Sequence, residues 1–114
     1  MLFRSVEGGN QFALDLYQQL RSEEGNLFFS PSSISTALAM TYAGAAGETE
    51  AEMAKTLHFQ MPKDQLHDGM HDLQSFWNTP DKKKGIRLNL ANRLWGQDSY
   101  EFLPAFLQIG RAHV

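Results

Sequence analysis

Two sets of side chains in this 114-residue sequence could do chemistry, and the first is a pair of histidines. His67 and His71 are four residues apart, with Asp64 and Asp68 beside them. Two imidazoles at that spacing share one helix face and suit zinc, but the general-base glutamate of an HExxH motif is absent and no third ligand is evident. We therefore expect no metal site, and we expect these four side chains to form a solvent-exposed helix face.

The second set is a cluster of serines, which could supply a nucleophile. It consists of Ser30, Ser32, Ser33 and Ser35. No GxSxG elbow surrounds these residues, and no known template places a histidine and an aspartate beside them. Ser30 can instead cap a helix whose first residue is Pro31. Because a glycine-rich phosphate loop is also absent, we expect that the chain is not an enzyme.

Composition and charge exclude several classes of protein. The formal net charge of −3 argues against nucleic-acid binding, because such binding depends on basic side chains that neutralise phosphates. We interpret the one basic run, Lys82 to Lys84, as a solvated loop rather than a polyanion site. No cysteine is present, so disulfides and thiolate metal sites are excluded. The first ten residues contain no apolar h-region, so no signal peptide is visible in this chain.

Apolar residues at helical spacing predict the elements that position these side chains. The first predicted helix is 10–20, with Asn10 as its cap, and the second is 31–43. A third begins with a capping box at 49–52, a fourth begins at Pro62, and a fifth starts at 102–108. The second is apolar around most of its circumference, yet it is far shorter than the about 20 residues of a membrane span, so we expect a buried helix. The fourth carries an apolar stripe that we assign to the core: Leu66, Met70, Leu73 and Trp77.

Two segments are predicted to be strands. Residues 86–95, IRLNLANRLW, alternate apolar and polar side chains, and residues 27–29 form a short apolar extended piece. Ten residues would span roughly 33 Å, which is long for a strand. A strand of that length needs partners for its N–H and C=O groups, and the sequence offers only the short piece. We therefore expect the long strand and the apolar helix to need partners beyond these residues.

Three stretches of the sequence together carry a family resemblance: NQFALDLYQQL, GNLFFSPSSISTALAMTYAGAAGETEAEMAKTLHF and LNLANRLWGQDSYEFLPAFL. In this order they resemble the N-terminal part of a serpin, from about Asn10 to Gln108. The resemblance implies an α+β serpin fold of which this chain holds only the N-terminal portion, with residues 1–108 as a partial serpin domain. It makes 27–29 a short strand of sheet B and 86–95 the second strand of sheet A.

A resemblance to serpins implies inhibition of serine or cysteine proteases by a suicide-substrate mechanism. The protease cleaves an exposed reactive loop near the far C-terminus, and the loop inserts into sheet A before the acyl-enzyme hydrolyses. That loop, and with it the reactive site, is absent from this chain. Two alternatives stay open: a non-inhibitory serpin that acts as a carrier or chaperone-like protein, and a free-standing helical module that binds through the face from Leu66 to Trp77.

The same resemblance gives the serines a role. In serpins the start of the second helix belongs to the shutter, where the central strands of sheet A part, and the matching positions here are Ser30, Pro31 and Ser33. Asn92 would face the same polar cluster. The polar side chains would satisfy backbone groups in a region that must open and reclose, which an apolar lining could not do.

Partners and location also follow from the resemblance. The expected partner is a target protease, bound through the missing loop, and we expect no nucleic acid, membrane, metal or cofactor. Heparin-binding serpins carry basic residues on the fourth helix, whereas KDQLHDGMHDLQSFW is acidic apart from Lys63, which argues against heparin. The resemblance implies a monomer in the extracellular space, with the cytoplasm as the alternative because no signal peptide is visible.

The last six residues, IGRAHV at 109–114, do not continue the amphipathic pattern. Gly110 is a poor helix residue, and the residues after it do not resume the stripe. One interpretation is a natural helix end with glycine at the C-cap. We favour a non-native tail, because the DNA sequence ATCGGAAGAGCACACGTC, which encodes IGRAHV, matches a sequencing adapter in wide use.

Overall fold

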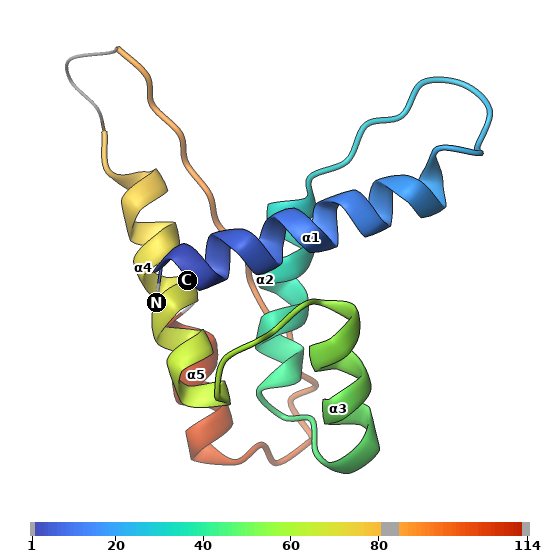
Figure 1. Cartoon of the computed structure of the whole chain (residues 1–114). Helices are drawn as coiled ribbons and strands as arrows, with labels where there is room; N and C mark the ends of the chain where they lie inside the picture. Colours follow the sequence, from blue (N-terminus) through green and yellow to red (C-terminus); the bar gives the residue numbers. More distant parts are fainter. Residues whose placement is uncertain (1, 81–84, 113–114) are drawn as a thin grey trace.

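The computed structural model describes the backbone of residues 2–80 and 85–112, and the side chains of residues 4–80 and 85–109. Within these residues the regular elements are helices: α1 Leu2–Leu20, α2 Pro31–Tyr42, α3 Gly47–Thr56, α4 Lys63–Asn78 and α5 Pro104–Ala112. Figure 1 shows α1 lying across α2 and α4, and α3 beside α2. No helix in the described part is long and apolar enough to cross a membrane.

Helix α1 begins eight residues before the predicted start, so Asn10 lies inside the helix and is not its cap. The prediction was wrong because Asn10, a residue type that is common at helix N-caps, was taken as the start of the helix. Gly8 is instead required by tertiary contact: an added Cβ would lie 2.5 Å from the carbonyl oxygen of His58, in the turn after α3. The crossing of α1 over α4 is equally close, because a Cβ on Gly69 would lie 2.7 Å from the Ser5 hydroxyl oxygen.

The hydrophobic core lies between α2, α3 and α4. Its buried members are Ala39, Tyr42, Met61, Leu66 and Met70, with Ala45, Met53, Ala54 and Phe59 packed against them. The predicted stripe on α4 is therefore confirmed for its first two members, while Leu73 and Trp77 are half-buried. Helix α2 is covered on one face only: Ser32, Leu38 and Thr41 are exposed, so the expectation of a helix buried all round was wrong for the described residues.

Helix α3 starts and ends differently from its prediction. Its N-cap is Ala46, without a side-chain cap bond, so Thr49 lies in the first turn and the predicted capping box does not form. The helix ends in a Schellman motif, in which the Phe59 N–H donates to Ala54 O at 2.9 Å and the His58 N–H donates to Lys55 O at 3.4 Å. His58 occupies the left-handed position of this motif, at φ +57°, where glycine is the usual residue.

The α+β expectation was wrong, because the described residues contain no sheet. Residues 27–29 and most of 86–95 are extended without ladder partners, and Ile86 makes only an isolated bridge. The physical reason is that no second described segment pairs with these residues. At Leu90 a side chain takes the place of a pairing strand: the Leu90 N–H donates to Asn78 Oδ1 at 2.6 Å, and its carbonyl accepts from Asn78 Nδ2 at 3.0 Å. A side-chain amide of α4 thus takes the backbone groups that a neighbouring strand would otherwise pair.

Helix α5 begins at Pro104, as a proline in the first turn allows, and runs to Ala112. It lies against α4, and its Phe106 ring packs on Gly44, just after α2, where an added Cβ would be 3.1 Å from the ring. Figure 1 shows the extended segment before α5 returning to this side of the molecule. The assignment of residues 109–114 to a non-native tail stays a prediction, and Lys82 to Lys84 lie outside the described residues.

Candidate functional site

The serine cluster sits at the first turn of α2, where local geometry accounts for two of its members. Ser30 is the N-cap, with φ −116° and ψ 99°, and its Oγ accepts from the Ser33 N–H at 3.3 Å. The same hydroxyl donates to Ser33 Oγ at 3.0 Å. Pro31 occupies the first helical position, where its missing N–H costs nothing. The predicted cap is confirmed, and Ser30 and Ser33 form one hydrogen-bonded unit at the helix start.

Asn92, the fourth predicted site residue, lies on the extended segment and is half-buried. Its Nδ2 has no hydrogen-bond partner among the described residues, and neither has the buried Oε1 of Gln74. Gln74 Nε2 donates to Leu90 O at 3.2 Å, so the extended segment is fixed to α4 two residues before Asn92. The structure brings Ser30, Pro31 and Ser33 together through sequence adjacency, and no described hydrogen bond joins them to Asn92.

The predicted solvent-exposed face of α4 divides at His67. Asp64, Asp68 and His71 are exposed, but the His67 side chain is buried, with 5% of its surface accessible, so its assignment to solvent was wrong. Burial lowers the pKa of His67, and the nearby Lys63 charge lowers it further, against an opposing effect of Asp68. No group of three possible metal-binding side chains is found in the described part of the chain.

Lys63, the one basic residue of the KDQLHDGMHDLQSFW segment, is held by its surroundings. Its Nζ donates to Ala45 O at 2.7 Å, lies 3.4 Å from Glu50 Oε2, and stands 4.7 Å from the centre of the Tyr42 ring. Burial and the Glu50 carboxylate both raise the pKa of Tyr42, so its phenol stays neutral beneath the ammonium. Lys63 therefore joins α4 to the α2–α3 connection.

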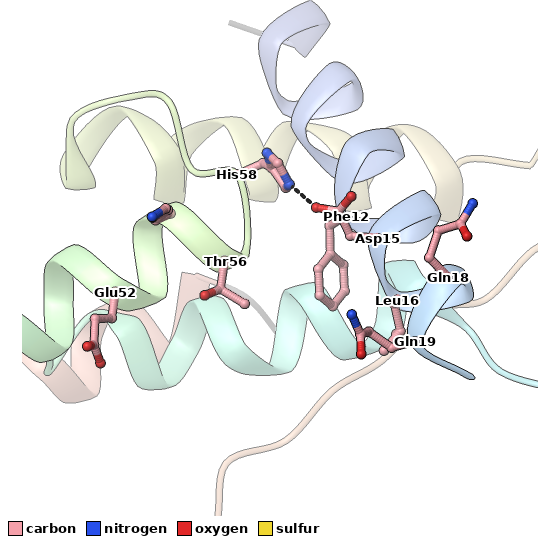
Figure 2. Close-up of a pocket in the computed structure, with 9 residues that line it drawn as sticks. Phe12, Asp15, Leu16, Gln18, Gln19, Glu52, Thr56 and His58 are labelled. Atoms are coloured by element: carbon pink, nitrogen blue, oxygen red, sulfur yellow. Dashed lines mark hydrogen bonds and ion pairs between the residues drawn. The ribbon is translucent and has the colours of Figure 1, made fainter. Parts of the chain in front are cut away.

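A site that the sequence did not reveal lies between α1 and α3. His58 Nε2 donates to Asp15 Oδ2 at 2.5 Å, beside a cavity of about 800 Å³ (Figure 2). Figure 2 shows the Phe12 ring pointing from α1 into the space between α1 and Thr56 of α3. The cavity walls carry the carboxylates of Asp15 and Glu52 and the ammonium of Lys55, and Asp15 is already bonded to His58, so the charge of the cavity selects neither an anion nor a cation.

A sequence signal for this contact was present but weak. Gly8, Phe12 and Asp15 follow a spacing of four and three residues, which places them on one face of a helix only if the helix starts before Gly8. The second hint was that no glycine follows Thr56 at the place where a helix commonly ends on one in the left-handed conformation. His58 occupies that conformation instead, and a residue with a side chain needs another contact to hold it there.

Comparison with known proteins settles the family. A family model described as Serpin (serine protease inhibitor) matches residues 7–114, which is most of the chain. The chain belongs to the serpin family. The resemblance carried by the three sequence stretches is thereby confirmed, and the first turn of α2 lies inside the part of this serpin chain that matches.

Curated relatives of the serpin chain include leukocyte elastase inhibitors from several vertebrates. The protein from Xenopus laevis is 47% identical over 98 residues, which cover 84% of this chain and 26% of the relative. The protein from Sus scrofa is 48% identical over 101 residues, and that from Homo sapiens is 43% identical over 101 residues; each alignment covers 85% of this chain and 25% of the relative. The chain therefore spans about a quarter of the length of the curated relatives it matches.

Proposed function

We propose that the full-length protein inhibits a serine protease by the suicide-substrate mechanism of serpins. The observation that supports this most strongly is the family match together with relatives that are named as leukocyte elastase inhibitors. In the proposed reaction the serine hydroxyl of the protease attacks a peptide bond of the reactive loop, and the amine leaves as an acyl-enzyme ester forms. Insertion of the cleaved loop into the body of the inhibitor then distorts the protease before water can hydrolyse the ester.

In this proposal Ser30, Pro31, Ser33 and Asn92 contribute to the region that opens during insertion. The bonded pair of Ser30 and Ser33 supports the role, because hydroxyls can exchange partners when neighbouring backbone groups move. The Asn92 Nδ2, which has no partner among the described residues, is a buried donor that another segment could satisfy. These residues affect the conformational step and not the chemistry of cleavage.

The test is to mix the full-length protein with leukocyte elastase and to look for a covalent complex that survives denaturing electrophoresis. We expect a band at the summed mass of protease and inhibitor, and loss of elastase activity at stoichiometric inhibitor. A control reaction with elastase whose active-site serine is blocked should give no such band. Cleavage without a complex would favour the carrier or chaperone-like alternative and would contradict the proposal.

We further propose that inhibition does not depend on heparin and that the inhibitor is a monomer acting outside the cell, with the cytoplasm as the alternative. The three contacts of Lys63 support the first part, because the one basic side chain of its segment is already engaged. Equal inhibition rates with and without heparin are expected, and a large acceleration would contradict this part. Immunodetection in culture medium against cell lysate distinguishes the two locations.

A further inference from the structure

The last turns of α4 hold the extended segment 86–95 at one residue, Leu90. Asn78, the last residue of α4, accepts from the Leu90 N–H at 2.6 Å through Oδ1 and donates to the Leu90 carbonyl at 3.0 Å through Nδ2. Gln74 Nε2 donates to the same carbonyl at 3.2 Å. Two amide side chains of α4 thus fix both backbone groups of Leu90, and we call this contact the Leu90 anchor.

Both amides of the Leu90 anchor are themselves held by α4. Gln74 and Asn78 are four residues apart, so they lie on the same face of the helix. Gln74 is 7% exposed, so its neighbours restrict the conformations of its side chain. Asn78 is exposed, but the end of the helix beside it is closed by the Thr79 hydroxyl, which donates to Ser75 O at 2.7 Å. The segment is therefore fixed to a helix of regular geometry.

The Leu90 anchor holds the segment from one side only. In an extended segment the N–H and the C=O of one residue point to the same side, and those of the next residue point to the opposite side. Because both groups of Leu90 face α4, the backbone groups of Asn89 and Ala91 face away from it. The anchor therefore fixes the segment without involving its other side.

We propose that Gln74 and Asn78 are positioning residues for the conformational step of inhibition, through the segment that carries Asn92. This inference rests on the proposed function, which places Asn92 in the region that opens when the cleaved loop inserts. Leu90 lies two residues before Asn92, so the anchor keeps this part of the segment in place while the surroundings on its other side move. Without the anchor the segment must be ordered during insertion itself, which costs backbone conformational entropy and slows the step.

Slower insertion changes the outcome of the reaction and not its first step. The protease cleaves the reactive loop, which α4 does not supply, so the rate of cleavage stays the same. Insertion then competes with water for the acyl-enzyme, and slower insertion leaves more cleaved inhibitor and less covalent complex. Loss of the Asn78 amide should slow insertion about 2- to 10-fold, the factor given by one hydrogen bond, because Gln74 still donates to the Leu90 carbonyl.

The experiment uses the full-length protein with leukocyte elastase and measures the rate of loop cleavage and the ratio of cleaved inhibitor to covalent complex. Asn78→Ala removes two bonds of the anchor, and Asn78→Asp has nearly the same size but lacks the donor to the Leu90 carbonyl. Both variants should raise the ratio about 2- to 10-fold at an unchanged rate of cleavage. Gln65→Ala, which removes an exposed amide from the same helix, is the matched control and should leave both quantities unchanged.

Hydrogen exchange of the Leu90 amide tests the anchor without any protease. Exchange should be about 2- to 10-fold faster in Asn78→Ala than in the parent, whereas Gln74→Met, which keeps the bond from the Leu90 N–H to Asn78, should change it less. Unchanged exchange in Asn78→Ala would show that the anchor does not exist in the full-length protein. Faster exchange with an unchanged ratio of products would overturn the positioning role alone.

Failure of the proposed function is recognised separately. A parent protein that elastase cleaves without any covalent complex would contradict both the proposed inhibition and the positioning role. The exchange rates of the Leu90 amide would still show whether Asn78 holds the segment. A lower rate of loop cleavage in Asn78→Ala and Asn78→Asp would show that the variants disturb the protein as a whole, which would also contradict the positioning role.

Discussion

Adjacent glycines in α1 should respond to alanine in opposite directions. An added Cβ at Gly8 would lie 2.5 Å from His58 O, well inside the 3.4 Å at which ordinary contact begins, whereas a Cβ at Gly9 would have nothing within 4 Å. Both positions are helical, so alanine gains about 0.5–1 kcal/mol of helix propensity at each. Only Gly8→Ala must also displace a neighbour.

The neighbour of Gly8 is held in two ways. The backbone of His58 is fixed in a left-handed conformation by the Schellman bonds at the end of α3, and its side chain is bonded to Asp15, two turns further along α1. Overpacking against a rigid group costs about 1–3 kcal/mol, which exceeds the propensity gain. The net range is about 0–2.5 kcal/mol, and we expect Gly8→Ala to lower the free energy of unfolding by about 1 kcal/mol, near its middle, and Gly9→Ala to raise it by about 0.5–1 kcal/mol.

The assay is urea denaturation of the full-length protein, followed by circular dichroism, with both single variants and the parent measured side by side. The two variants make the same substitution, in the same helix and with the same effect on the unfolded chain. The difference between their free energies of unfolding therefore reports the contact with His58. Equal stability of Gly8→Ala and Gly9→Ala would refute the close packing of α1 on the turn after α3.

Three other predictions follow from the described contacts. Ser30→Ala should lower the free energy of unfolding by about 1 kcal/mol and Ser33→Ala by less, because Ser30 Oγ still accepts the backbone N–H of residue 33; a reversed order in urea denaturation would contradict the cap. The pKa of His67 is lower in the folded than in the unfolded state, so stability is unaffected above the ordinary value of 6.5 and falls as pH drops below it; His67→Leu should flatten that fall in melts recorded against pH. The 114-residue chain expressed alone should bind a hydrophobic dye and melt without cooperativity, because its Phe28 and Trp95 side chains are 99% and 80% exposed. A sharp melt together with dispersed amide signals would contradict this prediction.

The sequence by itself determined the features that depend on neighbours along the chain. The start of α2 follows from Ser30 and Pro31, because a cap and a first-turn proline act within one turn. The core face of α4 follows from the spacing of Leu66 and Met70, because helical hydrogen bonds join residues four apart. The family followed from motifs in order, and so did the candidate positions Ser30, Pro31 and Ser33.

Only the tertiary structure decided the features that depend on residues far apart in the sequence. Position 8 requires glycine although it lies inside a helix, because the carbonyl of His58, fifty residues later, leaves no room for a side chain. His67 is buried although its neighbours on α4 are exposed, because helix packing and not residue type sets which side faces inward. Residues 86–95 have the alternation of a strand, but a strand exists only when a second segment pairs with it, and here the Asn78 side chain takes the backbone groups of Leu90 instead.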